Sequence, residues 1–291
     1  MVHGGSALAV ALCKWVEATA VRSEKNTITS INTRETAALD DAVGFLEPCA
    51  RCANSLLEAR GWRGVSITIN SDVPSGSGLG SSAATSVAVL ASVATLFNSP
   101  LDPAQLYEYA MIGEKLVHGR PSGIDAFVSI NGGLVKVRGN KREVVGCPPF
   151  WLMVSDSGES RNTGDMVRRV SEYRNMNRES FETLLRATEA LVDDSVEALR
   201  RGDISILAQG MNFNQEALRL VGASTEKIDT MVRTARAVGF TGAKLTGAGG
   251  GGCIIAVQAP DPQKSFENFR ANYPSSFLCS VPGEGVKTWL F

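Results

Sequence analysis

The feature that most constrains this chain is a strand-like segment that runs through a glycine-rich loop directly into a helix-like segment. Residues 65–70 (VSITIN) alternate apolar and polar side chains over β-branched residues, which predicts a half-buried strand. Residues 71–79 are rich in turn residues, and the Ala- and Val-rich stretch 81–96 predicts a helix. The predicted order is therefore strand, glycine-rich loop and helix.

The loop itself, residues 74–84 (PSGSGLGSSAA), has the composition of an anion-binding site. Glycines let backbone N–H groups approach a phosphate, and the N-terminus of the following helix adds a partial positive charge. Gly80 is followed by Ser81 and Ser82 with no lysine, so the loop is not a P-loop, nor does it have the GxGxxG spacing of a dinucleotide-binding turn. A tight strand-to-helix packing turn remains the alternative interpretation.

Other segments extend the alternation of helices and strands along the chain. We expect helices over 37–60, 104–116, 166–201, 204–220 and 225–238, and strands over 152–155, 243–246 and 253–257. Residues 127–137 suggest two strands joined at an Asn-Gly-Gly turn. Pro148 and Pro149 precede a new apolar run, which places a predicted domain boundary between an N-terminal domain, 1–147, and a C-terminal domain, 148–291.

Composition excludes several classes of function. The formal charge of -1 and the scattered Lys and Arg residues argue against nucleic acid as a main partner. Apolar stretches are too short to cross a bilayer and the first residues lack the pattern of a secretory signal, so we expect a cytoplasmic protein with reduced cysteines. Cys49 and Cys52 form a CxxC pair without a second metal-ligand pair nearby, which favours two buried residues on one helix face over zinc.

Three segments in sequence order resemble the GHMP kinase superfamily, which includes galactokinase, homoserine kinase, mevalonate kinase and phosphomevalonate kinase. The first is the glycine loop, residues 74–84. The second is EKLVHGRPSGID, residues 114–125, which resembles the segment of the mevalonate kinases in that family. The third is GAKLTGAGGGGC, residues 242–253. The resemblance implies an α+β fold of two domains, the N-terminal one like ribosomal protein S5 domain 2 and the C-terminal one ferredoxin-like.

The resemblance also implies roles for individual residues. Asp125 would be the catalytic base at the acceptor hydroxyl, while Ser82 and Glu114 would bind Mg²⁺. Without the resemblance, Glu114 would be an ordinary solvated carboxylate and Asp125 a turn or helix cap. The acceptor would contact His3, Thr163 and Gly249. The nucleotide would contact Ser71, Pro74, Gly76, Ser77, Gly78, Leu79, Gly80, Ser81 and Ser82. His118 is expected to support the turn that precedes Asp125, and Lys244 and Thr246 flank the last glycine run, where ordinary strand positions explain them equally well.

The activity implied is transfer of the γ-phosphate of ATP to mevalonate, with Mg²⁺ as cofactor. Members of the family also suggest a homodimer and inhibition by prenyl diphosphates. Alternatives are another small-alcohol acceptor, such as phosphomevalonate, or a non-catalytic nucleotide- or isoprenoid-binding protein. The family's N-terminal strand, with a lysine placed to neutralise the transferred phosphate, is matched here only by the V-H-G of residues 2–4. From this departure we expect an incomplete gene model or a shortened chain, in which the missing lysine would lower the rate of phosphate transfer.

Overall fold

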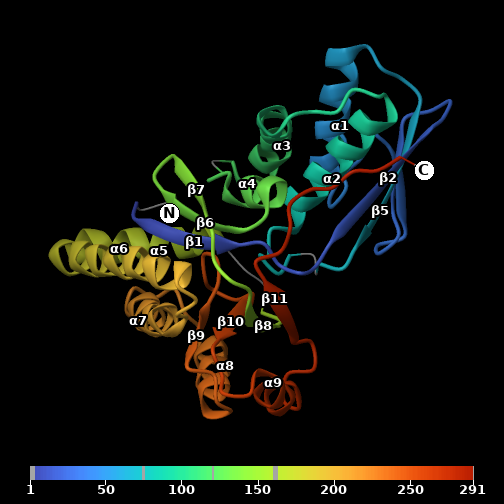
Figure 1. Ribbon diagram of the computed structural model, residues 1–291. Coiled ribbons are helices and arrows are strands. Elements are labelled where there is room, and N and C mark those ends of the chain that lie inside the picture. The colour runs from blue at the N-terminus through green and yellow to red at the C-terminus, as the bar shows by residue number, and fades with distance from the viewer. Residues whose placement is uncertain (1–3, 74–75, 120, 160–162, 291) are drawn as a thin grey trace. The chain divides into compact units, whose positions relative to one another are not determined.

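The computed structural model (Figure 1) describes residues 4–73, 76–119, 121–159 and 163–290. Its backbone groups into two compact units, and each is built from separate stretches of sequence. Unit 1 contains the described residues up to Cys13, residues 76–79 and residues 133–283. Unit 2 contains residues 14–75 and 80–132 and the described residues from Glu284 onward. The predicted division into domains at residues 147 and 148 stays a prediction.

Unit 2 is a four-stranded sheet with helices packed against one face (Figure 1). The strand order is β2-β5-β3-β4, in which β3 and β5 are parallel and the other pairs are antiparallel. The elements are β2 (Val16–Arg22), β3 (Thr27–Ser30), β4 (Glu35–Ala38), α1 (Glu47–Arg60), β5 (Val65–Ser71), α2 (Ser81–Leu96), α3 (Pro103–His118) and α4 (Ile124–Asn131).

The alternation seen in the sequence explains how this sheet is covered. Val65, Ile67 and Ile69 of β5 are fully buried in the core beneath the helices, whereas the residues between them face the opposite side. Helix α2 adds its apolar residues to the same core, and α3 begins with a capping box in which Asp102 and Gln105 bond each other's backbone N–H groups. The predicted strand 65–70 and the predicted helix 81–96 are confirmed.

Unit 1 contains two antiparallel sheets, ordered β1-β6-β7 and β11-β8-β10-β9. Its elements are β1 (Ser6–Val10), β6 (Leu134–Arg138), β7 (Lys141–Val145), β8 (Phe150–Asp156), α5 (Thr163–Met176), α6 (Arg178–Arg200), α7 (Ser205–Leu220), α8 (Glu226–Ala237), β9 (Gly242–Leu245), β10 (Cys253–Val257), α9 (Pro262–Arg270) and β11 (Phe277–Val281).

The four-stranded sheet of unit 1 is buried on both faces. Met153 and Ile254 pack on one side in a core with residues of α8 and α9. Leu152 and Val154 face the other side, in a core with Ala208 of α7. Because neither face is exposed, β8 and β10 are nearly continuous apolar runs without alternation.

Three passages of the chain meet in unit 1. The N–H of Ala11 donates to the carbonyl of Gly133 at 2.9 Å, Gly133 donates to Gly283 at 2.9 Å, and Gly283 donates to Ala11 at 2.7 Å. Each of the three residues lies close to a point where the chain passes from one unit to the other. Three segments that are far apart in sequence are therefore hydrogen-bonded to one another within unit 1.

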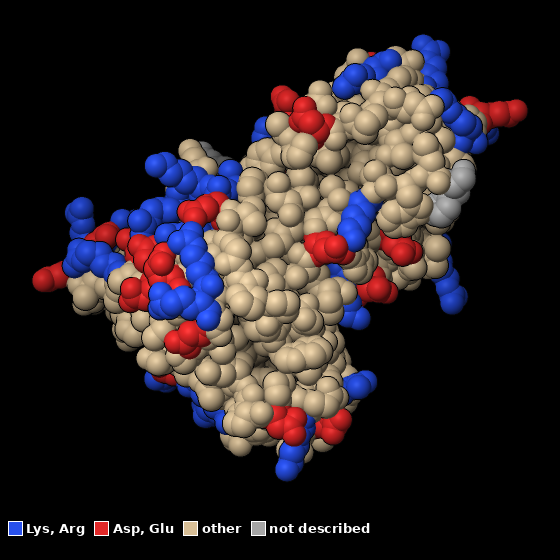
Figure 2. Space-filling view, in the orientation of Figure 1, with Lys and Arg blue, Asp and Glu red and all other residues tan. Residues whose placement is uncertain are grey.

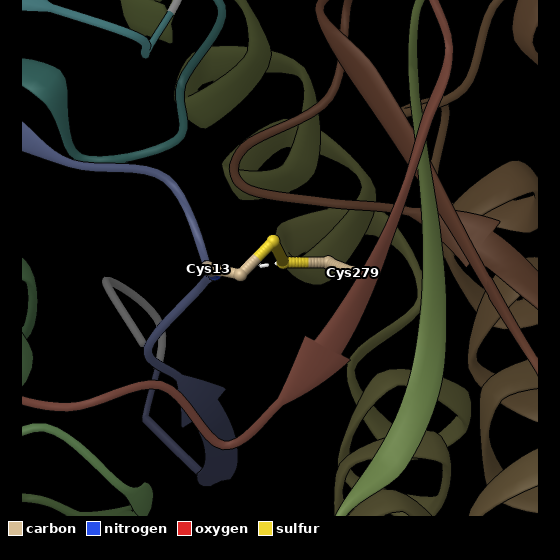
Figure 3. Close-up of a disulfide and its surroundings, with 2 residues drawn as sticks. All are labelled: Cys13 and Cys279. Atoms are coloured by element: carbon tan, nitrogen blue, oxygen red, sulfur yellow. Dashed lines mark hydrogen bonds between the residues drawn. A yellow bond between two sulfur atoms is a disulfide. The ribbon is translucent and has the colours of Figure 1, made fainter.

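A disulfide lies beside this meeting point, contrary to the expectation that the cysteines are unpaired. Cys13, which follows β1, is bonded to Cys279 of β11, with a Cα–Cα distance of 5.6 Å (Figure 3). The two cysteines are 266 residues apart in sequence, so no local sequence pattern predicts that they form a disulfide. Cys49 and Cys52 are both buried on α1, as the spacing predicts.

Two of the predicted elements are wrong. The expected helix 37–60 begins only at Glu47, and the residues before it include β4 and a turn at Gly44 with φ +60°. The first of the two strands expected over 127–137 is instead the C-terminal part of α4. Its segment is apolar and short, and such a run does not by itself distinguish a strand from a buried helix.

Charges of both signs are interspersed on the face that Figure 2 shows. Several basic side chains of unit 1 are paired: Lys136 and Arg138 of β6 both bond Asp193 of α6. In the part of the chain that the structure describes, no helix is long and apolar enough to cross a membrane.

Candidate functional site

The glycine loop ends at the first turn of α2, and its residues belong to both units. Residues 76–79 group with unit 1, where Leu79 packs against the core that contains Val154, and Ser77 is buried. Gly80 groups with unit 2 and stands at the N-cap of α2 with φ +74°. The left-handed backbone at this position favours glycine.

The hydroxyl groups at the start of α2 are buried but not hydrogen-bonded. Among the described residues, the Oγ atoms of Ser81 and Ser82 have no hydrogen-bond partner. A buried hydroxyl without a partner is costly, which indicates that a ligand completes its bonding. The N-terminus of a helix favours a negatively charged group, so the ligand that fits best here is an anion or a metal held by an anion.

Asp125 lies against this same helix start. It is in the first turn of α4, whose N-cap is Gly123, so the alternative role of Asp125 as the cap does not apply. A Cβ atom built on Gly80 would lie 3.3 Å from the Cβ atom of Asp125 and 3.7 Å from its Oδ1. Asp125 is solvent-exposed. The first and second sequence motifs therefore meet within unit 2, with an accessible carboxylate beside the end of the glycine loop.

Glu114 is buried, in contrast to the solvated carboxylate that the position would ordinarily hold. Its side chain in α3 is only 3% exposed. The neighbouring Gly113 allows α3 to approach α1 and α2, since a Cβ atom there would lie 2.9 Å from the Pro48 carbonyl oxygen and 3.0 Å from the Cys52 sulfur. The pKa of Glu114 is raised to about 7, mainly because its side chain is buried and to a smaller extent because of the negative charge of Asp125.

A small pocket of about 290 Å³ opens beside Ser82 in unit 2. Apart from Ser82, it is lined by Gly44, Phe45, Pro48, Cys49, Thr85 and Val117. The lining is mostly apolar and includes Ser82, whose hydroxyl has no hydrogen-bond partner among the described residues. Such a pocket suits a flat, largely apolar group attached to an anion. The sequence prediction missed Phe45 and Pro48, because they were read only as part of a long helix.

The described residues contain no cluster of three or more His, Cys, Asp and Glu side chains that could by themselves hold a metal. The candidate ligands are Glu114 and Ser82, to which a bound nucleotide would add its phosphate oxygens. Mg²⁺ is commonly held by only one or two protein groups together with substrate phosphates and water. The residues present fit that mode of binding.

The third motif, the glycine run Gly247–Gly252, lies in unit 1 between β9 and β10. Gly249 has φ +84°, and a Cβ atom there would lie 2.0 Å from the carbonyl oxygen of Ala223. Lys244 of β9 donates to the Leu245 carbonyl, and burial lowers the pKa of its ammonium group to about 8. Thr163 is the first residue of α5.

Substitution of Gly249 by alanine should destabilise the protein. The side chain would meet a backbone oxygen and would adopt a left-handed conformation, so we expect a loss of at least about 2 kcal/mol in the free energy of unfolding. Gly222→Ala is a matched control, because Gly222 has φ +77° but no atom within 4 Å of its Cβ position. Urea denaturation of both variants measures the difference; equal losses would contradict the close contact at Gly249.

The remaining predicted site residues are placed as follows. His3 and Pro74 lie outside the described residues. Ser71 ends β5, and its Oγ accepts from the Val73 N–H at 3.1 Å, as a strand-end cap does. The side chain of Asn32, which has no motif of its own, bonds both the N–H and the carbonyl of Ser71. His118 is the exposed last residue of α3.

Comparison with known proteins decides which family this arrangement represents. The family of GHMP kinases N terminal domains matches residues 48–133, and that of GHMP kinases C terminal domains matches residues 195–274. The chain belongs to the GHMP kinase family. The two matched segments contain, respectively, the glycine loop with Glu114 and Asp125, and the final glycine run.

Individual GHMP kinases are similar over most of the chain. A protein of Aeropyrum pernix named mevalonate kinase is 35% identical over 83% of this chain and 76% of its own length. One of Archaeoglobus fulgidus with the same name is 37% identical over 79% of this chain and 75% of its own length. The crystal structure of L. major mevalonate kinase in complex with R-mevalonate has a TM-score of 0.83 at 23% identity, covering 98% of this chain and 92% of that one. The expected α+β GHMP kinase fold is confirmed.

Proposed function

We propose that this chain transfers the γ-phosphate of ATP to the primary hydroxyl of mevalonate. The observation that carries the proposal is the meeting, within unit 2, of Asp125, the buried Glu114 and the unpaired hydroxyls at the start of α2. These are the groups that phosphoryl transfer needs, namely a base, a metal ligand and an anion site. The choice of mevalonate as acceptor rests on relatives of that name that are similar over most of the chain.

The nucleotide would bind at the start of α2. Its phosphates would accept hydrogen bonds from the N-terminal turn and from the hydroxyls of Ser81 and Ser82, which are otherwise without partners among the described residues. The nucleobase would enter the pocket lined by Phe45 and Val117. This arrangement accounts both for the orphaned hydroxyls and for the apolar pocket beside them.

Ser82 and Glu114 would hold Mg²⁺ against those phosphates. The ion would neutralise part of the negative charge on the transferred group. Glu114 holds a proton readily near neutral pH because it is buried, and it would have to release that proton to act as a ligand.

Asp125 would act on the acceptor. Its carboxylate is exposed and stands beside Gly80, so a hydroxyl bound there would lie next to the phosphate site. The carboxylate would accept the hydroxyl proton as the oxygen attacks phosphorus in line with the leaving ADP oxygen. Binding both reactants in this orientation supplies much of the rate enhancement in such enzymes.

An ADP-release assay with Mg²⁺, ATP and mevalonate tests the proposal directly. We expect turnover that requires all three components. Phosphomevalonate, homoserine and galactose, supplied in place of mevalonate, test the alternative acceptors. If the folded protein is stabilised by ATP but releases no ADP with any acceptor, the chain is a nucleotide-binding protein and the proposed activity is wrong.

The substitution Glu114→Gln should change stability in a pH-dependent way. In the folded protein the pKa of Glu114 is raised from 4.5 to about 7, so the folded state binds a proton more tightly than the unfolded state. Wild-type stability should therefore fall as pH rises from about 4.5 to about 7 and then level off. Glutamine does not titrate, so the variant should gain about 2–3 kcal/mol over wild type across that window.

Urea denaturation of both proteins at pH 5 and pH 8 measures this gain. Glu108→Gln, which removes an exposed carboxyl group from the same helix, is the control. The Glu114→Gln variant should also need more Mg²⁺ for half-maximal turnover. If the free energies of unfolding of Glu114→Gln and wild type differ by the same amount at pH 5 and pH 8, the raised pKa of Glu114 is contradicted.

Several further expectations are proposals of the same kind. These are the division into domains at residues 147 and 148, assembly as a homodimer, inhibition by prenyl diphosphates and a location in the cytoplasm. Each follows from what the resemblance to the kinase family implies, and the two matched family segments, 48–133 and 195–274, lie on either side of the proposed boundary.

A further inference from the structure

Strand β9 lies at an edge of the four-stranded sheet in unit 1. Among the described residues it pairs with β10 alone. Residues of an antiparallel strand direct their backbone groups alternately to its two sides, and the N–H of Thr246 donates to the carbonyl of Cys253 on the β10 side. Lys244 therefore also bonds β10, whereas the backbone groups of Ala243 and Leu245 point to the free edge. Such an edge is a template for pairing with another chain.

Helix α7 packs closely enough to reach this edge (Figure 1). Its residues Ala208, Asn212 and Gln215 lie on one face of the helix, because they follow one another at intervals of four and three residues. Gly242 at the start of β9 permits the close approach, since a Cβ atom there would lie 2.5 Å from the Cα of Ala208. The two amide side chains are thereby brought beside the strand.

Both amide side chains bond the backbone of β9 and of the residue before it. Asn212 Oδ1 accepts from the N–H of Ala243 at 3.1 Å, and its Nδ2 donates to the carbonyl of Thr241 at 2.7 Å. Gln215 Oε1 accepts from the N–H of Leu245 at 2.8 Å. An amide side chain carries a donor and an acceptor, so it can bond a strand as the backbone of a neighbouring strand would.

Two cationic side chains bond the carbonyl groups at the same edge. Arg236, in the last turn of α8, donates from Nη2 to the carbonyl of Ala243 at 3.2 Å. Lys244 donates from Nζ to the carbonyl of Leu245. Burial lowers the pKa of the Lys244 ammonium group to about 8, and this bond gives the group an acceptor. The N–H and carbonyl groups of Ala243 and Leu245 are therefore all bonded to side chains.

Four side chains form what we call the edge cap: Asn212, Gln215, Arg236 and Lys244. We propose that the edge cap takes the place of a neighbouring strand and keeps β9 from pairing with β9 of a second copy of the chain. The contacts lie wholly within unit 1 and include none of the residues proposed for catalysis. Lys244, which belongs to the third sequence motif, thereby has a structural role at the strand that leads into the glycine run.

Hydrogen exchange of individual backbone amides tests the edge cap. In Asn212→Ala the N–H of Ala243 loses its acceptor, so it should exchange at least about tenfold faster than in wild type. The N–H of Leu245 keeps Gln215 and should change by less than about threefold. Asn212→Asp keeps an oxygen that can accept from Ala243 and should retain slow exchange there. Asn214→Ala, on the same helix but without a bond to β9, is the matched control.

Self-association tests the consequence of an open edge. Asn212→Ala combined with Lys244→Met frees one N–H and two carbonyl groups within residues 241–245. We expect this double variant to form larger assemblies than wild type in light scattering as the protein concentration rises, whereas Asn214→Ala should match wild type. Within the assemblies the N–H of Ala243 should again exchange slowly, because β9 of a second copy covers it.

The outcomes decide for or against the edge cap. Unchanged exchange of Ala243 in Asn212→Ala would overturn the proposal, and so would a double variant that stays in the same assembly state as wild type. Strand β8 lies between β10 and β11, so its amides report on the sheet as a whole. Assemblies in which the β8 amides also exchange faster would likewise overturn the proposal, since they indicate general unfolding. Slow exchange in β8 together with larger assemblies would support pairing at the edge.

Discussion

Asp125→Asn should lower kcat for ADP release by about 10²–10⁴-fold while the protein remains folded and binds ATP. Asparagine has nearly the same shape but cannot accept the acceptor proton. Asp125 is exposed in the first turn of α4, so the loss of its charge should cost the helix only about 0.3–1 kcal/mol. Steady-state kinetics measure kcat. A thermal melt with and without ATP measures both the stability of the fold and the binding of ATP.

A second effect of the same substitution checks the geometry. Since the charge of Asp125 contributes to the raised pKa of Glu114, its removal should lower that pKa. Glu179→Gln, which removes an exposed carboxylate from the first turn of α6, is the control and should leave kcat unchanged. If Asp125→Asn keeps more than about a tenth of the wild-type kcat, Asp125 is not the base.

Loss of the Cys13–Cys279 disulfide should produce the largest change in stability. The bond closes a loop with a sequence separation of 266 residues, and cross-links that close long loops restrict the unfolded chain most. We expect Cys13→Ser to lower the free energy of unfolding by about 4 kcal/mol and the melting temperature by about 10 °C. A reducing agent should have the same effect on wild type and none on the variant.

Thiol counting provides an independent check. The sequence has six cysteines, and two of them form the Cys13–Cys279 disulfide. Unfolded, unreduced wild type should therefore show four reactive thiols; six would contradict the bond. Cys147→Ser is the control and should lack the large loss of stability. In the folded protein Cys49 should react slowly, because burial raises the pKa of its thiol to about 12.

Local pattern in the sequence was sufficient to predict the strand and the helix on either side of the glycine loop. The alternation of residues 65–70 and the Ala- and Val-rich stretch 81–96 determine β5 and α2, since both are set by neighbours in sequence. Asp125 and Glu114 were found through resemblance to a family. By local pattern alone they were a cap and a surface charge, and their roles in the site stay predictions.

Features that depend on distant contacts could not be predicted. The burial of Glu114 follows from the close approach of α3 to α1 at Gly113, and the Thr225–Glu159 bond joins residues 66 apart in sequence. The short apolar run 127–131 has no strong periodicity by itself; as part of α4 it buries Ile130, together with Ala126, in a core with residues of α1 and α2. In each case the deciding neighbour lies outside the local segment.

The interleaving of the two units imposes an order on folding during synthesis. The sheet of β2 to β5 and its helices lie within residues 14–132, so they can emerge and pack early. Strand β1 is made before them but can pair only once β6 has been made, and Cys13 can bond only once Cys279 has been made. Ribosome-bound chains that stop before β6 should therefore hold an exposed, unpaired β1 that is available to chaperones or to incorrect pairing.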